Sequence, residues 1–236
     1  MNLDLSRIRA VSLDLDDTLW PIWPTIERAE RALHAWLGER APATAAMWSD
    51  APALRRIRDE LAAARPELLH DLSAVRRESI RMALGQAGDD AALADAAFEV
   101  FFAERQRVEL FDDARAALDF LAARYPLVAV SNGNADLQRI GLGAYFRGAL
   151  SARAFGVGKP DPRIFRAAAD AAGVAPDQVL HVGDDATLDA LGAMDAGLQA
   201  AWLNRGDHPW PHAGQPHATV ARLDDLCELL AEVPAR

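Results

Sequence analysis

The sequence predicts an α/β protein whose core is a doubly wound parallel sheet, interrupted near its start by an all-helical insertion. Two observations lead to this prediction. One short strand-like run, residues 10–15, precedes a long stretch that shows only helical spacing. From Val108 onward, short apolar runs alternate with helical segments, a pattern that favours parallel strands joined by helices. We therefore predict an α/β core of residues 1–20 and 108–236 and a helical domain of residues 21–107.

The first predicted strand carries chemically distinctive side chains. Residues 10–15 read AVSLDL, in which apolar and polar residues alternate with the period of a strand. Ser12, Asp14 and Asp16 consequently share one face. The sequence therefore predicts two neighbouring carboxylates where this strand ends.

The insertion shows helical spacing throughout. Apolar residues follow Pro21 and Pro24 at intervals typical of an amphipathic helix. We expect Gly38 to end this first helix, since glycine adopts the left-handed conformation that closes many helices. The further expected helices are a segment around Ile57 and Leu61, a segment that Asp71 caps and Gly88 closes, and about 89–107.

The rest of the core alternates between the two kinds of pattern. Strands are expected at 127–132, 178–183 and 198–204. Helices are expected at 113–124, 135–141, 162–172 and 187–196, and another in the C-terminal LDDLCELLAEV. Pro162 suits the first turn of its helix. His181 ends an apolar run, and we interpret it as a buried, hydrogen-bonded core residue rather than a general base.

The composition bounds the class of partner. The chain has 236 residues, of which 51% are hydrophobic and 25% charged, values that are ordinary for a globular protein. Its 25 Lys and Arg against 35 Asp and Glu leave a net charge of −10, which repels phosphate backbones and anionic lipids. We therefore expect a small-molecule partner, with no nucleic acid or membrane, and a monomer or homodimer.

The sequence also bears on the cellular compartment. Cys227 is the only cysteine, so no intramolecular disulfide forms. The opening MNLDLSRIRAV carries charges where a secretory signal needs an apolar run. No uninterrupted stretch approaches the roughly 18 apolar residues of a membrane span. We predict a cytoplasmic protein.

Polar residues follow each of three predicted strands. The three segments are DLDDT (14–18), SNGN (131–134) and GDD (183–185), and a loop with GKPDP (158–162) lies between the last two. In a parallel sheet the carboxyl ends of the strands meet at one edge, where ligands bind at the switch in strand order. The sequence therefore predicts a single site that holds carboxylates, a hydroxyl, an ammonium group and glycine-exposed amides.

The carboxylates of this site indicate a metal ion. Asp14 and Asp16 crowd two negative charges together, which is costly unless a cation neutralises them. Mg²⁺ takes a few hard oxygen ligands and keeps several waters, so Asp14, Asp184 and a backbone carbonyl suffice. We count Asp14, Asp16 and Asp184 as the candidate ligands. Any one aspartate by itself is more often a helix cap or a solvated charge.

Two further features indicate a bound phosphate. Ser131 precedes Asn132 and Gly133, whose backbone N–H groups could cradle an anion. Lys159 is the only lysine in a chain that otherwise uses arginine, although an isolated lysine is ordinarily a surface charge. A compact ammonium group neutralises phosphate where the planar arginine fork does not fit.

Together, DLDDTLW, VSNGN, GKPDP and HVGDDATLD resemble the four motifs of the haloacid dehalogenase superfamily, in that order. The resemblance covers the whole chain and implies a Rossmann-like core with a type-one helical cap at the insertion. It implies that Asp14 is the nucleophile and Asp16 the acid/base. It further implies catalytic roles for Ser131 and Lys159, substrate contacts from Leu15, Thr18, Asn132 and Gly133, a metal ligand in Asp184, and support from Asp185 and Asp189.

The resemblance also implies the reaction. It predicts magnesium-dependent hydrolysis of a phosphate ester through an aspartyl phosphate, with the cap discriminating among substrates. PELLHDLSAVRRESI and LVAVSNGNADLQRIGLGAYF are similar to bacterial flavin-mononucleotide phosphatases, a group linked to the ribitylaminouracil phosphate of riboflavin synthesis. A flavin mononucleotide or riboflavin-pathway phosphate is therefore the expected substrate.

Several alternatives stay open. The chain could be a sugar-phosphate or phosphoglycolate phosphatase of the same superfamily. A haloacid dehalogenase needs neither a metal nor an acid at Asp16, so Asp16 argues against that activity. A phosphoaspartyl receiver would be a shorter chain without the insertion. A non-catalytic phosphate-binding protein is disfavoured because Asp14 and Asp16 are both intact.

Overall fold

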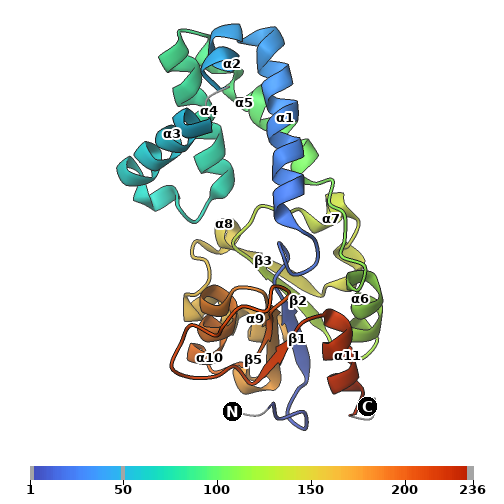
Figure 1. Ribbon diagram of the computed structural model, residues 1–236. Helices are drawn as coiled ribbons and strands as arrows, with labels where there is room; N and C mark the ends of the chain where they lie inside the picture. Colours follow the sequence, from blue (N-terminus) through green and yellow to red (C-terminus); the bar gives the residue numbers. More distant parts are fainter. Residues whose placement is uncertain (1–2, 49–50, 233–236) are drawn as a thin grey trace. The chain divides into compact units, whose positions relative to one another are not determined.

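The fold is known from a computed structural model, which describes residues 3–48 and 51–232. The chain forms two compact units (Figure 1). One consists of Met1–Pro21 with Glu109–Arg236, and the other of Ile22–Val108. Residues 1–2, 49–50 and 233–236, which the predicted domains include, lie outside the described residues.

The first unit contains a parallel sheet. Its strands are β1 (Ala10–Leu13), β2 (Leu127–Ser131), β3 (Gly148–Ser151), β4 (Val179–Gly183), β5 (Gln199–Leu203) and β6 (Ala218–Val220). They lie in the order β3-β2-β1-β4-β5-β6, and every pair is parallel. The chain therefore winds outward in both directions from a switch point between β1 and β4. The predicted fold class is confirmed.

The two outer strands, β3 and β6, were not predicted. They have four and three residues, and several of their side chains are only partly buried or are exposed. GALS and ATV are too short to show alternation, and GALS contains no β-branched or aromatic residue. Pairing with β2 and β5 makes them strands, so tertiary context outweighs local preference here.

Helices cover both faces of the sheet (Figure 1). On one face lie α9 (Pro162–Ala172) and α10 (Gly192–Asp195), which share a buried apolar cluster with the strands. On the other face lie α6 (Ala114–Ala122) and α11 (Leu223–Ala231). Pro162 occupies the first turn of α9 as expected, and Asp161 accepts a bond from Arg163 N as its cap.

Short helical segments complete this unit. They are α7 (Leu137–Ile140), η3 (Gly143–Tyr145), α8 (Ala152–Phe155), η4 (Pro176–Gln178) and η5 (Ala186–Leu191). The last is a π-helix that begins three residues after β4. Such wide turns occur frequently at functional sites, so the side chains of η5 are candidates for a role in the predicted site.

The described secondary-structure elements of the second unit are all helices. Its elements are α1 (Ile22–Arg40), α2 (Pro42–Trp48), α3 (Ala51–Ala64), η1 (Pro66–Leu68), α4 (Leu72–Ala87), η2 (Ala91–Leu93) and α5 (Ala94–Arg105). Asp71 and Gly88 cap the two ends of α4, as expected. The expectation that Gly38 ends the first helix is wrong, because α1 continues to Arg40. Leu37 and Ala41 are fully buried in the cluster of this unit, and that packing outweighs the glycine.

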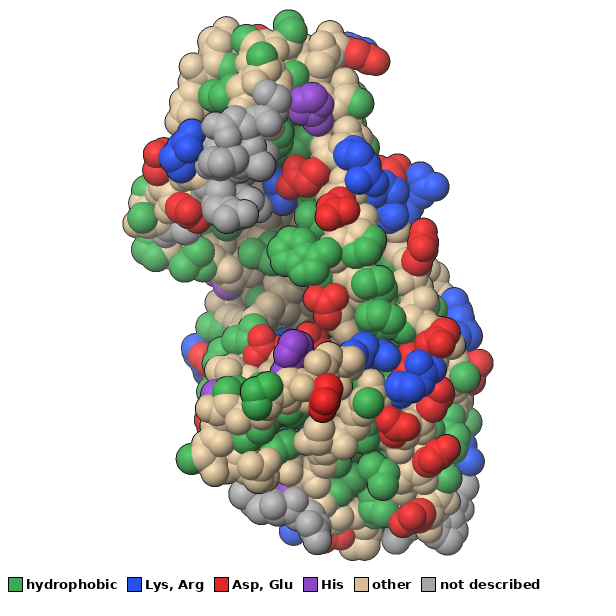
Figure 2. Space-filling model, in the orientation of Figure 1, with side chains coloured by type: hydrophobic (Ala, Val, Ile, Leu, Met, Phe, Trp, Pro, Cys, Tyr) green, Lys and Arg blue, Asp and Glu red, His purple; other side chains and the backbone are tan. Residues whose placement is uncertain are grey.

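None of the described helices has the length and hydropathy needed to cross a membrane. Figure 2 shows acidic and basic side chains intermixed on the face in view. The net negative charge is therefore not gathered into one patch on that face.

Candidate active site

The predicted site residues meet at the carboxyl ends of β2, β1 and β4. Ser131 is the last residue of β2, Asp14 directly follows β1, and Asp184 directly follows β4. The Asp14 N–H donates to Val182 O at 2.9 Å, which extends the β1–β4 pairing to the aspartate itself. This edge lies at the switch point, where the fold class places its ligands.

Lys159 lies between two carboxylates. Its Nζ donates to Asp14 Oδ1 and to Asp189 Oδ1, both at 2.5 Å. The side chains of these three residues are at most 9% exposed. Charge-assisted bonds in such a dry environment are strong, so the ammonium group fixes both carboxylates.

The pKa values reflect this burial. Burial raises the pKa of Asp14 well above its ordinary value, despite the opposing charge of Lys159. Burial would lower the pKa of Lys159, but the charges of Asp14 and Asp189 outweigh it and raise that pKa. Burial also raises the pKa of Asp184 to about 7, and the charges of Asp189 and Asp17 act in the same direction. Asp14 and Asp184 are therefore harder to ionise here than exposed aspartates.

Asn132 holds the loop that carries Lys159. Its side-chain Nδ2 donates to Lys159 O at 2.8 Å, and its Oδ1 accepts from Lys159 N at 2.7 Å. A Cβ at Gly158 would lie 2.4 Å from Asn132 Oδ1, so the close contact between the Asn132 side chain and this loop needs a glycine at position 158. The Asn132 side chain therefore anchors the backbone of Lys159, a role that the sequence analysis missed. The expected contact of Asn132 with substrate stays a prediction.

A tight turn carries Asp16. Asp17 has a φ of 58°, and its N–H donates to Trp20 O at 2.8 Å. The fully buried Trp20 ring donates from Nε1 to Asp16 Oδ1 at 2.8 Å. Leu15 is also buried, and its carbonyl accepts from Leu19 N. The tryptophan therefore orients the Asp16 carboxylate, a contact that no sequence pattern indicated.

Asp184 contacts residues from distant parts of the chain. Thr18 is fully buried, and its Oγ1 donates to Asp184 Oδ1 at 3.3 Å. Trp202 of β5 donates from Nε1 to Asp184 O at 2.8 Å. In this structure Thr18 therefore contacts a candidate metal ligand, and its expected contact with substrate stays a prediction.

The π-helix η5 places Asp189. Asp185 caps η5 by accepting from Thr187 N and Leu188 N, and its own N–H donates to Asp189 Oδ2 at 3.0 Å. A Cβ at Gly183 would lie 2.2 Å from Asp189 Cγ. The glycine before Asp184 therefore allows the close packing of Asp189 under the site.

Ser131 is 4% exposed and lies at the same edge of the sheet as the carboxylates. Its Oγ accepts from Gly133 N at 2.9 Å. This hydrogen bond stabilises the SNGN turn. The Ser131 hydroxyl and the backbone N–H groups of the turn therefore lie close together.

Arg205, which the sequence analysis did not single out, supports the turn with Asp16. Its guanidinium bonds both oxygens of Asp113, at 2.9 and 3.0 Å, and donates to Thr18 O at 3.1 Å. The guanidinium carbon also lies 4.0 Å from the centre of the Phe111 ring. Its position just after a predicted strand was the only signal in the sequence.

The donor set of the site fits a hard divalent cation. Asp14, Asp184 and Asp189 each offer a carboxylate oxygen, and these oxygens lie within 4.8 Å of one another. Three carboxylates thus cluster beside a single lysine, and all-oxygen sites of this kind suit Mg²⁺. Asp16 contributes no carboxylate to this group among the described residues, and its expected role at a metal stays a prediction.

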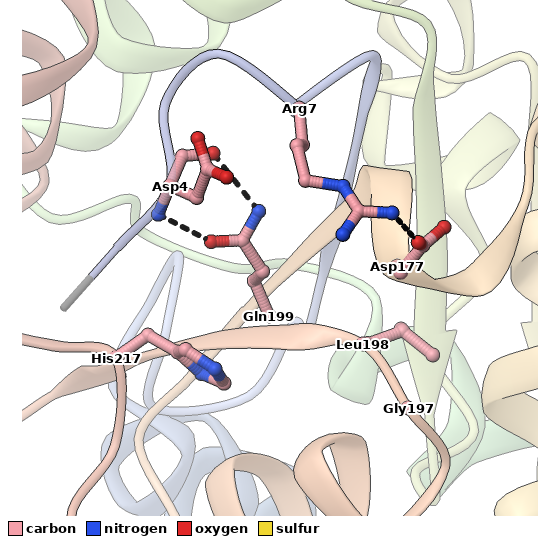
Figure 3. Close-up of a pocket in the computed structure, with 7 residues that line it drawn as sticks. All are labelled: Asp4, Arg7, Asp177, Gly197, Leu198, Gln199 and His217. Atoms are coloured by element: carbon pink, nitrogen blue, oxygen red, sulfur yellow. Dashed lines mark hydrogen bonds and ion pairs between the residues drawn. The ribbon is translucent and has the colours of Figure 1, made fainter. Parts of the chain in front are cut away.

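A separate hollow of about 330 Å³ lies at the amino end of β5 (Figure 3). Asp4 and Gln199 bond to each other there, and Arg7 pairs with Asp177. No predicted site residue lines it. This hollow is therefore distinct from the site at the carboxyl ends of the strands.

The strand order and the acidic cluster at the switch point define a Rossmann-like enzyme of the doubly wound class. The chain belongs to the haloacid dehalogenase-like hydrolase family, whose family model matches residues 8–197. The resemblance that the four motifs suggested is thereby confirmed.

Individual relatives differ in their activities. The chain is 36% identical to the 5-amino-6-(5-phospho-D-ribitylamino)uracil phosphatase YigB of Escherichia coli, over 96% of this chain and 98% of that one. It is 38% identical to a phosphoserine phosphatase of Thermus thermophilus, over 64% and 63%. A crystal structure described as a 2-haloacid dehalogenase, from Pseudomonas syringae pv. Tomato DC3000, has a TM-score of 0.87 and 39% identity over 95% of this chain and 99% of that one.

Proposed function

We propose that this chain, a phosphatase of the haloacid dehalogenase superfamily, hydrolyses a phosphate ester of riboflavin synthesis through an aspartyl phosphate on Asp14. The observation that carries the mechanism is the buried Asp14 carboxylate, held by Lys159 at the switch point of the sheet. The substrate assignment is supported by the likeness to YigB along nearly the whole of both chains. Flavin mononucleotide and ribitylaminouracil phosphate are the two esters we propose.

The first step transfers the phosphoryl group to the enzyme. We assign the attack on phosphorus to Asp14 Oδ2, the oxygen that Lys159 does not hold. A bond forms between this oxygen and phosphorus while the bond from phosphorus to the substrate oxygen breaks. Asp16 gives its proton to the departing alkoxide, so the alcohol leaves neutral.

The second step regenerates the enzyme. A water molecule attacks phosphorus and gives its proton to Asp16, and the bond between phosphorus and Asp14 breaks to release phosphate. One carboxyl group thus serves as acid and then as base. The bond from Trp20 to Asp16 keeps that carboxyl in one orientation through both steps.

The remaining residues neutralise charge on the phosphoryl group. Lys159 has three N–H bonds, two of which point to Asp14 and Asp189, and we assign the third to a phosphoryl oxygen. Ser131 and the amides of its turn bind the other oxygens. Asp14 and Asp184 would hold Mg²⁺, which neutralises part of the phosphate charge when bound.

A second candidate is hydrolytic dehalogenation of a 2-haloacid, which the similarity to the Pseudomonas syringae structure favours. In that reaction Asp14 attacks carbon and a halide leaves without needing a proton. The oriented Asp16 and the clustered carboxylates have no task there. They favour the phosphatase over the dehalogenase.

A substrate panel tests the assignment. We expect kcat/KM to be higher for flavin mononucleotide or ribitylaminouracil phosphate than for sugar phosphates and phosphoglycolate, with no halide released from 2-chloropropionate. A clear preference for the sugar phosphates overturns the substrate and keeps the mechanism. Halide release without phosphatase activity overturns both.

The Asp14→Asn variant tests the nucleophile. The amide barely changes the volume but cannot attack phosphorus, so turnover should disappear while circular dichroism and the melting temperature stay near those of the wild type. Acid quenching of the wild type with labelled substrate should trap phosphate on Asp14. Label on any other residue contradicts the mechanism.

A further inference from the structure

A buried chain of hydrogen bonds leads from the middle of the sheet to the site. Ser12 of β1 and His181 of β4 are register partners, and Ser12 Oγ lies 2.8 Å from His181 Nδ1. The other ring nitrogen, Nε2, lies 3.2 Å from Asp189 Oδ1. Ser12 and His181 have no exposed surface, and Asp189 is 1% exposed. The chain ends on the carboxylate that Lys159 also holds.

The other partners of Asp189 set the direction of these bonds. Asp189 Oδ1 accepts from Lys159 Nζ and Oδ2 accepts from Asp185 N, so both carboxylate oxygens act as acceptors. An acceptor oxygen needs a donor opposite it, so the contact at Oδ1 places a proton on His181 Nε2. In this Nε2–H tautomer, Nδ1 accepts from the Ser12 hydroxyl.

We infer that His181 is a positioning residue, whose Nε2–H holds Asp189 so that Lys159 stays fixed against Asp14. The inference rests on the proposed phosphatase function. Asp189 Oδ1 accepts from both His181 and Lys159, and Oδ2 accepts from Asp185 N. Without the imidazole, Asp189 loses a donor on the oxygen that anchors Lys159.

The packing around the ring supports this role. The edge of Phe165 in α9 meets the imidazole, with the ring centroids 5.0 Å apart and the planes at 86°. This contact restrains the ring plane, and the Ser12 hydroxyl contacts Nδ1 at 2.8 Å. The imidazole is thus held on two sides and can serve as a rigid donor.

Two substitutions at His181 separate positioning from packing. His181→Phe keeps a planar ring without a donor, and kcat on the best phosphate ester should fall about 10- to 100-fold with little change in KM. His181→Gln places an amide N–H near Nε2 and should recover most of that loss. Val179→Ala is the matched control, because it removes buried volume from the same strand without removing a polar group, and kcat should stay at the wild-type value.

Equal losses for Phe and Gln, or none for either, overturn the inference. If the Phe variant does not fold, as judged by circular dichroism, ¹⁵N NMR of the wild type decides. The spectrum should show His181 protonated at Nε2 and unprotonated at Nδ1, and the opposite tautomer overturns the inference. If the wild type is inactive on every phosphate ester, the proposed function is refuted. The tautomer of His181 measured by NMR still tests the hydrogen bond to Asp189 in that case.

Discussion

Asp16 and its tryptophan illustrate how single residues set the chemistry of this site. Two aspartates separated by one residue have different partners: Lys159 holds Asp14, and Trp20 holds Asp16. A charged ammonium group therefore contacts the first carboxylate, and a neutral indole N–H contacts the second. The different roles that we propose for the two aspartates are matched by different hydrogen-bond partners.

Asp16→Asn tests the acid role. We expect kcat to fall about 10²- to 10⁴-fold for an alkyl phosphate, whose leaving group needs a proton. The loss should be much smaller for nitrophenyl phosphate, since nitrophenolate leaves without one. Steady-state rates with both esters provide the measurement, and equal losses would show that Asp16 is not the acid.

Asp113→Asn tests the pair that supports the Asp16 turn. Burial opposes ionisation of Asp113, but Arg205 and the Leu223 N–H outweigh it and lower the pKa of Asp113 below its ordinary value. A carboxyl with a lowered pKa in the folded state stabilises the fold above its unfolded pKa of about 4 and loses that contribution as pH falls through the folded pKa.

The variant should therefore lose about 3 kcal/mol in the free energy of unfolding at pH 7, the cost of leaving one member of a buried pair alone. This difference from the wild type should shrink below about pH 4. Urea unfolding at several pH values provides the measurement. A difference that does not change with pH contradicts the assignment.

At the scale of elements, the turn from β4 into η5 places two aspartates on the site. Gly183 ends β4, Asp184 follows it, and the wide turn of the π-helix brings Asp189 back against the strand end. A regular α-helix would present side chains at a different angle after the same number of residues. The acidic cluster therefore depends on a local irregularity of the backbone.

Gly183→Ala tests this placement. The new Cβ would lie 2.2 Å from Asp189 Cγ, so the carboxylate that Lys159 contacts must shift from its position. Displacement by about 1 Å should lower kcat roughly 100-fold. Gly85→Ala in α4 is the control: nothing lies within 4 Å of its Cβ, and activity should not change. An active Gly183→Ala enzyme would contradict the placement argument.

At the scale of the whole molecule, charge and metal binding are linked. The chain carries a net charge of −10, and its buried site holds three carboxylates against one lysine. Concentrated negative charge destabilises the folded state unless cations compensate it. We therefore expect metal binding to stabilise the protein as well as to support catalysis.

Mg²⁺ should raise the melting temperature of the wild type. At a hundredfold excess over Kd, the added stability is about 2.7 kcal/mol for a ligand that binds only the folded state. Asp184→Ala should weaken this stabilisation, while Asp177→Ala, at the hollow on β5, should keep it. Thermal melts with and without chelator provide the measurement, and a wild type indifferent to Mg²⁺ contradicts the metal assignment.

The sequence by itself determined the fold class, the inner strands and the strand ends at which the polar motifs lie. Periodicity reports which face of a segment is buried, and parallel strands must bring their carboxyl ends to one edge, so both follow from local pattern. Only the tertiary structure decided the outer strands, the length of α1 and the partner of each site residue. Lys159 meets Asp14 across 145 positions in the sequence, and Arg205 meets Thr18 across 187. Such contacts depend on register and packing among distant segments, which no local pattern encodes.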